Sequence, residues 1–457
     1  MKLDSKWSVL LIISLGIFIT TLDGSILSVA NPTIAFDLGV SMQNVQWVVT
    51  SYLLVITSSL IFFGRLGDKL GNNTVFTYGF LIFTLGSLAC SMSGSLPLLI
   101  AARLFQGIGG SMMMATGIGI VSNIFPAAER GKALGLTGTV VALGNMLGPG
   151  VGGLLLGNYP WPFIFLLNIP LGLLGFYLGL RYLPAFDPER ACAGYDFRGT
   201  IILALSLTSV TIALAQSPTM NIGLLLSAAI LLLFFFFYEK KTPYPLLDFD
   251  VFKSPTFVYG NLVAIAVYCT HTSVFFLLPF YLEQVMNYSS VHTGILMTIP
   301  PIVMAITAPL AGYFSDKFGS PRIIGISLTV LAAAFYALST LGNTAGFMLS
   351  LGVGLVLLGI GLGMFGSPNT SSIMGSIPRQ KAGYGGGFLA TTRNLSYSLG
   401  IASSVSFFSW MLQKKQVNLD YVSAYIEASH YVYLYAAFII SGVLVLFLLF
   451  LIKPRSS

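Results

Sequence analysis

Charged residues are scarce in this sequence. Asp, Glu, Lys and Arg make up 8% of its 457 residues, whereas a soluble domain carries about 25%. So few charges cannot cover a protein of this size with solvated groups, and the mean hydropathy is +0.86. A soluble fold is therefore excluded. A net charge of +7 would suggest a nucleic-acid partner in a soluble protein, but here we expect none, because of where the basic residues lie.

Groups that bind metals or cofactors are equally scarce. The three histidines are scattered, and the three cysteines, Cys90, Cys192 and Cys269, are odd in number and well separated. They match neither a disulfide framework nor a metal-binding spacing. A P-loop is missing, and the glycine runs do not follow strand patterns. We therefore expect no metal, no cofactor and no enzymatic activity. Any transport must draw on an ion gradient or on the gradient of the substrate itself.

Long apolar segments are abundant. Runs of roughly 20 apolar residues recur along the chain, and each can cross the ~30 Å hydrocarbon core of a bilayer as a helix. They are continuously apolar, unlike the alternating strands of a membrane barrel. The first follows the short start MKLDSK and is too long for a signal-peptide core, so we expect it to be retained. The sequence predicts an all-α polytopic membrane protein with fourteen spans, at residues 7–31, 43–64, 73–93, 97–123, 132–157, 161–183, 198–216, 220–238, 255–285, 291–313, 321–342, 345–374, 383–411 and 431–452.

Basic residues gather on one side of the predicted spans. With fourteen spans both termini share a side, and the loops and tails of that side hold 18 of the 22 Lys and Arg residues. The opposite loops hold Lys414 and Lys415, while Arg103 and Arg393 fall within spans. Because cytoplasmic loops are enriched in Lys and Arg, we predict a multi-pass protein of the cytoplasmic membrane with both termini in the cytoplasm.

One loop pattern occurs twice. GRLGDKLGNN at residues 64–73 and GYFSDKFGSP at 312–321 share four residues at the same spacing, 248 positions apart. The shared positions are Gly64, Asp68, Lys69 and Gly71, and Gly312, Asp316, Lys317 and Gly319. Two similar bundles related by an axis along the membrane normal are a transporter architecture. We predict an N-terminal six-helix bundle (1–183), a linker with two additional helices (184–254) and a C-terminal six-helix bundle (255–457).

Three further motifs lie within predicted spans. They read LDGSILSVANP at residues 22–32, LIAARLFQGIGGS at 99–111 and GNMLGPGVGGLL at 144–155. With the repeated loop, they resemble the first-helix, fourth-helix and antiporter motifs of the major facilitator superfamily, and within it the fourteen-span drug/proton antiporters. The resemblance covers the whole chain and extends to QWVVTSYLL, WPFIFLLNIP and PLLDFDVF. It implies two pseudo-symmetric six-helix bundles plus two additional helices, and antiport by alternating access.

The resemblance also gives the repeated loop a conformational role. Asp68 would latch the cytoplasmic side, either by accepting hydrogen bonds from a helix N-terminus or by pairing with Arg130 or Lys132. Asn72 and Asn73 stand where the family pattern usually has two basic residues. Without these charges the resemblance does not imply a latch of the usual strength. The alternative is a solvated turn with no latching role.

Glycines carry the remaining conformational motifs. Gly148-Pro149 interrupts the hydrogen-bond ladder of the fifth span and predicts a hinge. Gly64 and Gly71 would let two helix ends approach each other. Glycines of the fifth span form small-residue faces on which another helix can pack: Gly144, Gly148, Gly152 and Gly153. Ordinary close packing of helices needs the same glycines and is the alternative.

Asp23 is an acid inside the otherwise apolar first span. It lies about 16 residues from the start of that span, hence ~24 Å along the helix, and Arg103 in the fourth span reaches a similar depth from the other side. Such a buried acid has a functional role by default. We predict that Asp23 alternates between protonated and charged states as access changes, and so couples protons to transport. The alternatives are that Asp23 caps a helix broken at Gly24 and that Arg103 extends to the outer interface.

Three ionisable residues fall within spans of the second half. Glu283 is a candidate proton or cation site near the outer gate, or an interfacial acid that faces water. His271 is a candidate proton acceptor, or a neutral histidine with a hydrogen bond. Arg393 faces the central cavity or a nearby acceptor, in a functional or a structural role. Polar and aromatic residues that suit a cavity for amphipathic ligands are Gln46, Trp47, Tyr52, Asn145, Asn168, Tyr268, Tyr281 and Asn369.

These features predict a proton-coupled exporter of amphipathic, often cationic, small molecules that acts as a monomer by alternating access. Its partners would be protons, the substrate and the lipid bilayer. Two alternatives remain, because a fold does not define a function. The first is export of a native metabolite, lipid or peptide on the same scaffold. The second is a membrane sensor or assembly partner without transport activity.

Overall fold

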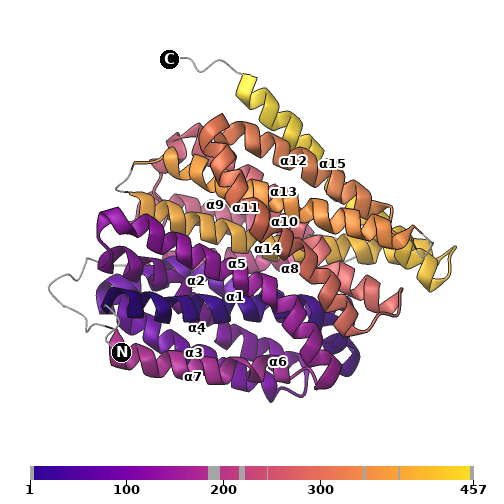
Figure 1. Cartoon of the computed structure of the whole chain (residues 1–457), viewed down its shortest axis with the longest axis horizontal. Helices are drawn as coiled ribbons and strands as arrows, with labels where there is room; N and C mark the ends of the chain where they lie inside the picture. The colour runs from indigo at the N-terminus through magenta and orange to yellow at the C-terminus, as the bar shows by residue number, and fades with distance from the viewer. Residues whose placement is uncertain are drawn as a thin grey trace. The chain divides into compact units, whose positions relative to one another are not determined.

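Helices dominate the described structure. This computed structural model describes residues 5–183, 196–215, 222–243, 245–342, 346–378 and 381–452. Within these residues, helices are joined by short turns and loops (Figure 1). The predicted all-α fold class is confirmed.

The first half of the chain contains α1 Ser5–Asp37, α2 Met42–Leu70, α3 Asn72–Ser91, α4 Leu96–Ile124, α5 Ala127–Asn158, α6 Phe163–Leu166, α7 Asn168–Tyr182, α8 Phe197–Ala215 and α9 Ile222–Glu239. The second half contains the 3₁₀ helix η2 Val251–Lys253, then α10 Pro255–Gln284, α11 Ser290–Phe318, α12 Ser320–Ser339, α13 Phe347–Gly375, α14 Ala382–Gln416 and α15 Tyr421–Ile452. Each predicted span overlaps one helix, except that 161–183 divides into α6 and α7 at Leu167.

The helices are long enough to cross a membrane. Among the described residues, twelve are long and apolar enough to span, and α2 adds a thirteenth if its two parts, which meet at 52°, form one span. The helix α9 coincides with the predicted span 220–238 but is shorter, with 18 residues. The chain is therefore a multi-pass membrane protein.

Several helices extend beyond the predicted spans, most of all around the last turn of the chain. The last helix begins at Tyr421 rather than at 431, and α14 continues to Gln416, so Lys415 lies in a helical turn rather than in a loop. The Lys415 ammonium donates a hydrogen bond of 3.1 Å to Glu427, which ties these two polar helix ends together. Counting apolar residues cannot detect such polar turns, because it measures only the part of a helix that lipid covers.

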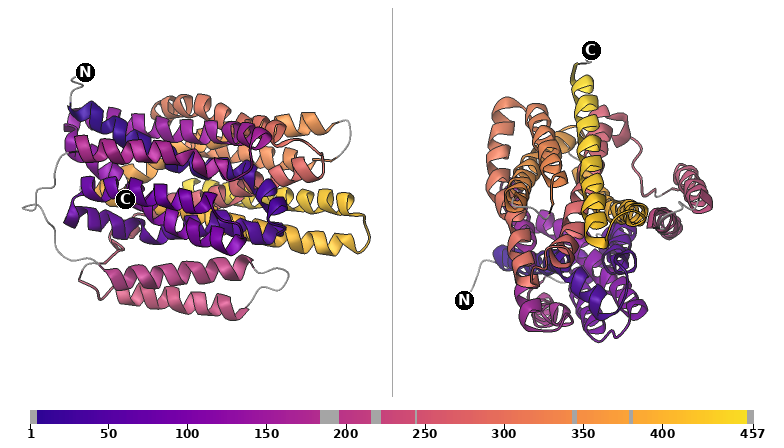
Figure 2. Two further views of the ribbon diagram at one scale, coloured as in Figure 1. Left: turned by 90° about the horizontal axis from the view of Figure 1, so that it is seen from below. Right: turned by 90° about the vertical axis from the view of Figure 1, so that its right-hand side faces the viewer.

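The helices group into two compact units. Unit 1 comprises Met1–Ala213 and Asn221–Asp248, and unit 2 comprises Leu214–Met220 and Phe249–Ser457. In unit 1, α1 packs along α5, and α4 packs along α2 and α3; in unit 2, α13 packs along α11 and α12, and α10 packs along α14. Both views of Figure 2 show α8 and α9 side by side.

Glycines bring α3 and α4 close together. A Cβ atom added to Gly109 of α4 would lie 2.3 Å from the backbone nitrogen of Phe83 and 2.7 Å from the carbonyl oxygen of Gly79 on α3. A Cβ atom added to Gly86 of α3 would lie 2.5 Å from the Cα atom of Gln106 on α4. The two backbones therefore approach more closely than any other residue type would allow.

The predicted small-residue face of α5 packs on α1. A Cβ atom at Gly144 would lie 2.1 Å from the Thr21 hydroxyl oxygen, and one at Gly148 would lie 1.9 Å from that of Ser25. The Ser25 hydroxyl also donates a hydrogen bond of 2.9 Å to the carbonyl of Gly144. The helix α5 continues through Pro149 from Ala127 to Asn158. The helix is thus continuous in this conformation, and bending of α5 at Pro149 during transport stays a prediction.

The repeated loop forms the same turn twice. Gly71 between α2 and α3 has φ 93°, and Gly319 between α11 and α12 has φ 88°, a backbone conformation that favours glycine. The expectation for Gly64 is wrong, because Gly64 lies within α2 and no atom is within 4 Å of its Cβ position. The close approach occurs one turn later, where a Cβ atom at Gly67 would lie 2.7 Å from the Thr116 methyl group.

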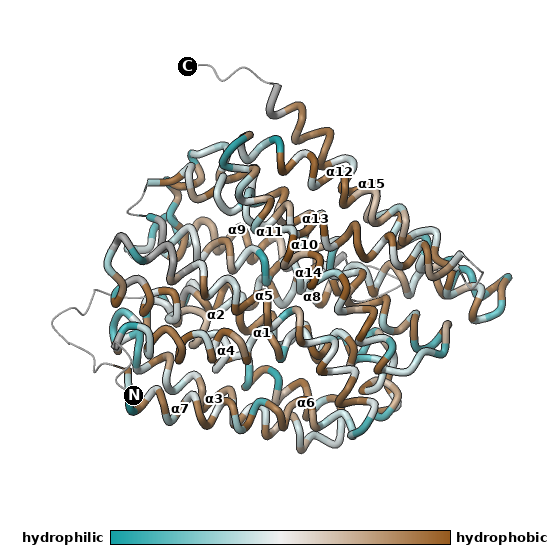
Figure 3. Tube along the Cα trace, viewed as in Figure 1, coloured by the Kyte–Doolittle hydropathy of each residue, from teal (hydrophilic) through white to brown (hydrophobic). Residues whose placement is uncertain are grey.

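Large apolar side chains are exposed along the helices. Leu180 of α7 is 60% exposed, Leu233 of α9 59% and Phe438 of α15 67%. Figure 3 shows hydrophobic residues along the helices and many of the hydrophilic ones near the turns. Lipid would cover these side chains, as expected for helices that cross a bilayer.

We expect Gly109→Ala to lower the thermal stability of the protein purified in detergent. The added methyl group would have to displace the α3 backbone at Phe83, and overpacking of this kind costs about 1–3 kcal/mol. Gly138→Ala is the matched control, because no atom lies within 4 Å of the Gly138 Cβ position on α5. Thermal-shift midpoints compare the two variants with the wild type. Equal midpoints for Gly109→Ala and the wild type would contradict the described packing of α3 on α4.

Candidate functional site

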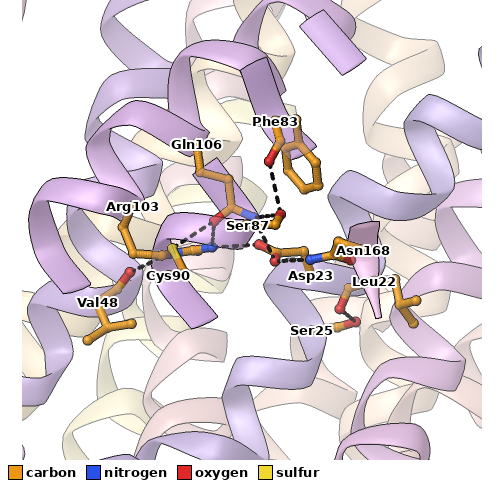
Figure 4. A network of polar contacts seen from close by, with 10 residues as sticks. All are labelled: Leu22, Asp23, Ser25, Val48, Phe83, Ser87, Cys90, Arg103, Gln106 and Asn168. Carbon is orange, nitrogen blue, oxygen red and sulfur yellow. Dashed lines mark hydrogen bonds and ion pairs between the residues drawn. The ribbon is translucent and has the colours of Figure 1, made fainter. Parts of the chain in front are cut away.

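Asp23 is buried in an unbroken helix. The helix α1 runs from Ser5 to Asp37 without interruption at Gly24, so the alternative in which Asp23 caps a broken helix is wrong. Asp23 is 3% exposed, and its carboxylate points toward α4 and α7 in the network of Figure 4. A carboxylate in such a position must be compensated by nearby donors or positive charge.

Arg103 of α4 supplies the compensating charge. Its Nη1 atom lies 2.6 Å from Asp23 Oδ2, and Arg103 is fully buried. The alternative in which Arg103 reaches the interface is therefore wrong. The two residues that the sequence placed at similar depth meet directly. Removing one partner from a buried ion pair costs about 3–5 kcal/mol, because the other charge is left unpaired.

Gln106 bridges the two charged side chains. One helical turn after Arg103, its Oε1 atom accepts a hydrogen bond of 2.6 Å from Arg103 Nη1. Its Nε2 atom donates to Asp23 Oδ1 at 3.0 Å and to the Ser87 hydroxyl at 2.8 Å. The Cys90 thiol of α3 also contacts Gln106 Oε1 at 3.6 Å. A single amide thus connects α1, α3 and α4.

Asn168 of α7 completes the environment of the carboxylate. Its Nδ2 atom donates a hydrogen bond of 2.7 Å to Asp23 Oδ1, and Asn168 is fully buried. The sequence assigned Asn168 to a substrate cavity, whereas the structure places it on the acid. Asp23 therefore accepts hydrogen bonds from Arg103, Gln106 and Asn168, which lie on α4 and α7.

The guanidinium of Arg103 is held on its other side by α2. Its Nε atom donates a hydrogen bond of 2.9 Å to the carbonyl oxygen of Val48. Its Cζ atom lies 4.1 Å from the centroid of the Tyr52 ring and 5.7 Å from that of Phe165, which are cation–π distances. Tyr52, which the sequence placed in a cavity, thus packs against the ion pair.

The motif RLFQGIGGS explains why these side chains can meet. A Cβ atom at Gly107 would lie 3.0 Å from the Val55 Cβ atom on α2, and one at Gly110 would lie 2.7 Å from the Tyr52 hydroxyl oxygen. Together with Gly109, which faces α3, these glycines admit two neighbouring helices to α4. The short distances let Arg103 reach the backbone of α2 and the acid on α1 at the same time.

Three buried polar atoms of this network are unpaired. Arg103 Nη2, the Tyr52 hydroxyl and Asn168 Oδ1 have no hydrogen-bond partner among the described residues. An unpaired buried polar group costs about 1–3 kcal/mol. The network therefore contains donors and an acceptor that no described residue uses.

The other predicted residues of unit 1 lie apart from this network. Gln46 is buried, and its amide donates to the backbone of its own helix at Gln43. Trp47 and Asn145 are partly exposed. The side chains of Arg130 and Lys132 lie outside the described part of the structure, so the predicted latch to Asp68 remains a prediction. Among the described residues, Asp68 takes a hydrogen bond from the side chain of Asn72.

In unit 2 the predicted residues separate into three places. Tyr281 is buried and its ring stacks on Phe347 with centroids 6.0 Å apart, while the neighbouring Glu283 is partly exposed. Asn369 of α13 donates a hydrogen bond of 3.3 Å to the carbonyl of Gly260 on α10. Tyr268, His271 and Arg393 lie nearer the middle of α10 and α14.

Sequence reasoning missed two polar contacts of Gln106 and one aromatic residue of unit 2. Ser87 and Cys90 occur in an apolar span with no motif, and Tyr397 occurs in the run TTRNLSYSLG. Only the rotation of each helix about its axis decides which neighbours such residues touch. Gln106 was visible in the fourth-helix motif, but the motif does not show that its amide binds the acid.

Comparisons with known proteins agree with this architecture. The sequence matches the profile of the Major Facilitator Superfamily over residues 13–401. The riboflavin transporter RibZ of Clostridioides difficile (strain 630) is 44% identical over 455 residues, which cover 100% of both chains. The tetracenomycin C resistance and export protein of Streptomyces glaucescens is 30% identical over 404 residues, covering 87% of this chain and 74% of the relative.

A solved structure shares the fold. It is a bacterial homologue of the human lysosomal transporter Spinster in an inward-facing and unoccupied conformation, with a TM-score of 0.71 and 15% sequence identity. The likeness covers 98% of this chain and 97% of that one. Because the family profile spans most of the sequence and a relative is 44% identical over its full length, this chain belongs to the major facilitator superfamily.

Proposed function

We propose that this transporter is a proton-coupled antiporter that moves amphipathic small molecules by alternating access. The observation that supports it is the buried carboxylate of Asp23, which pairs with Arg103 at 2.6 Å. An ionisable group at this depth is costly and marks a proton or ion pathway by default. The orientation with both termini in the cytoplasm, the cytoplasmic membrane and action as a monomer belong to the same proposal.

Protonation of Asp23 would be coupled to helix movement, because its carboxylate connects three helices. Asp23 on α1 accepts hydrogen bonds from Arg103 and Gln106 on α4 and from Asn168 on α7. A proton added to the carboxylate removes its negative charge and the attraction to Arg103. The described packing of α1 is then less favourable, and another arrangement gains population. Loss of the proton to the opposite side of the membrane restores the ion pair.

The substrate has two supported classes. Cationic amphipathic compounds follow from the resemblance to drug/proton antiporters, and the relative named as a tetracenomycin C resistance and export protein supports export as the direction of transport. A native metabolite is supported by the full-length relative that is named a riboflavin transporter, at 44% identity. The higher identity and the complete coverage favour a flavin-like metabolite. Flux into proteoliposomes separates both classes from a sensor without transport activity.

We expect Asp23→Asn to abolish transport driven by a pH gradient. The amide keeps the size of the side chain but cannot carry the proton. The measurement is flux of riboflavin and of ethidium, a cationic amphipath, in proteoliposomes with and without a pH gradient. Asp37→Asn is the matched control, because Asp37 ends the same helix and accepts a hydrogen bond of 2.7 Å from Trp161. Gradient dependence like that of the wild type in Asp23→Asn would overturn the proposal.

A second variant guards against loss of folding. Asp23→Asn leaves Arg103 without its anionic partner, so the single variant is less stable than the wild type. The double variant Asp23→Asn with Arg103→Gln removes both charges and should recover much of the thermal-shift midpoint, because replacing a whole buried pair is often neutral. It should still show no response to the pH gradient. Recovery of gradient-driven flux in this folded variant would contradict a coupling role for Asp23.

We also expect Arg103→Lys to impair transport although the charge is kept. The guanidinium bonds Asp23, Gln106 and the Val48 carbonyl at the same time, and a lysine ammonium cannot reproduce this planar geometry. Initial rates should fall by at least about tenfold, which corresponds to about 1.4 kcal/mol. Arg181→Lys, at the exposed end of α7, is the control. Wild-type rates in Arg103→Lys would show that charge alone is sufficient.

A further inference from the structure

Aromatic rings from three helices of unit 2 lie together. Tyr268 and His271 of α10 both contact Tyr397 of α14, with ring centroids 5.6 and 5.7 Å apart. Phe275 lies one turn further along α10 and contacts His271 at 4.6 Å. Tyr268 also contacts Phe365 of α13 at 5.9 Å. We call these five residues the aromatic cluster.

The aromatic cluster lies deep within the helices yet is not closed. Tyr268 and His271 are about 13 and 16 residues from the start of α10, hence ~20–24 Å along a helix that is long enough to span. At that depth Phe365 is fully buried, whereas Tyr268, His271, Phe275 and Tyr397 are all partly exposed. Residues 268, 271 and 275 share one face of α10, because their spacing follows the helical period. That face of α10 therefore leaves part of its aromatic side chains exposed.

Arg393 places a positive charge beside this surface. It lies one turn before Tyr397 on α14, and its charge acts on the hydroxyl groups of both Tyr268 and Tyr397. Among the described residues, no hydrogen bond or ion pair ends on its guanidinium. The acids of unit 2 lie near helix ends or between helices, at Asp250, Glu283, Asp316, Asp420 and Glu427. The charge of Arg393 is thus uncompensated at a depth where charge is costly.

His271 adds an unused hydrogen-bonding atom. Its Nδ1 atom is buried and has no partner among the described residues. Buried polar atoms are normally satisfied, so this atom lacks a donor or acceptor. The Arg393 side chain is partly exposed and can offer its guanidinium to an acceptor. Unit 1 differs, because both carboxylate oxygens of Asp23 are occupied by donors of its own unit. The described structure offers a free cationic group to a substrate but no free anionic one at this depth.

We propose that the aromatic cluster and Arg393 bind a planar heteroaromatic ring that is neutral or anionic. The ring stacks against Tyr268, Tyr397 and Phe275, a ring carbonyl or anionic group accepts hydrogen bonds from Arg393, and His271 Nδ1 bonds an edge of the ring. The guanidinium disfavours cationic substrates by charge repulsion. This inference rests on the proposed transport function and narrows its substrate class from amphipathic compounds in general.

The test measures binding without any gradient. Full-length protein in nanodiscs is titrated with riboflavin, which is neutral, with flavin mononucleotide, which is anionic, and with ethidium, which is cationic. The readouts are fluorescence quenching for the flavins and fluorescence anisotropy for ethidium. The wild type should bind both flavins more tightly than ethidium. Arg393→Gln should weaken flavin mononucleotide binding by about 10- to 100-fold, as expected when a hydrogen bond to a charged group is lost, and should improve ethidium binding.

Variants of Tyr397 test the stacking. Tyr397→Leu should weaken riboflavin binding by about two- to tenfold, the range for loss of one aromatic pair, whereas Tyr397→Phe should bind like the wild type. Trp410→Leu on the same helix is the control, since Trp410 contacts Phe407 rather than the aromatic cluster. Thermal-shift midpoints show whether each variant is folded. Tyr397→Phe keeps the ring and loses only the hydroxyl group, so weak riboflavin binding by folded Tyr397→Phe would contradict a stacking role.

The outcomes distinguish this inference from the proposed function. Tighter binding of ethidium than of flavins by the wild type, or unchanged flavin binding in both Arg393→Gln and folded Tyr397→Leu, overturns the inference and leaves proton coupling intact. Normal flavin binding that depends on Arg393 and Tyr397, combined with flux that ignores the pH gradient, supports the inference and refutes the proposed antiport. Asp37→Asn should bind riboflavin like the wild type, because Asp37 ends α1 and belongs neither to the aromatic cluster nor to the network around Asp23.

Discussion

The ion pair between Asp23 and Arg103 is the constraint on which unit 1 depends. Two charges held away from water are tolerated only when geometry and further hydrogen bonds compensate their desolvation. Here Gln106, Asn168 and the Val48 carbonyl provide those bonds, so four helices must keep a fixed mutual position. The glycines that bring α4 onto α2 and α3 serve the same end. Close packing and charge compensation are therefore one requirement, and a change in the charge of Asp23 acts on the packing of every helix that it joins.

The spans, the depth of the ion pair and the repeated turns could be predicted from the sequence, because a bilayer restricts which segments can cross it. Apolar length marks the spans, and distance along a helix indicates that Asp23 and Arg103 have similar depth. The repeated loop indicates matching turns, which Gly71 and Gly319 form with positive φ angles. The partners of the acid were less visible. Asn168 was assigned to a substrate cavity, and Ser87, which binds Gln106, has no charge or motif that sets it apart. Only the rotation of α3 and α7 brings these side chains to the network. Gly64 was chosen from a motif, although Gly67 makes the close contact.

The two units use polar groups in opposite ways. In unit 1 a base and an acid compensate each other, and three hydrogen bonds occupy the oxygens of the carboxylate. In unit 2 a single arginine has no described partner and lies beside partly exposed rings. Two bundles that share a loop motif have thus diverged at mid-depth, one toward a closed charged network and one toward an open aromatic surface. Such a division suits a carrier in which proton binding and substrate recognition depend on different helices.

The charge of Arg393 also bears on the energy available for transport. When an antiporter exchanges one proton for one monovalent cation, no net charge crosses the membrane, and only the proton gradient drives the exchange, at about 1.4 kcal/mol per pH unit. When the substrate is neutral, each cycle moves one positive charge inward, and the membrane potential adds about 2.3 kcal/mol per 100 mV. An anionic substrate gains twice that amount. A guanidinium that selects against cations therefore favours the substrates whose export gains most from each proton.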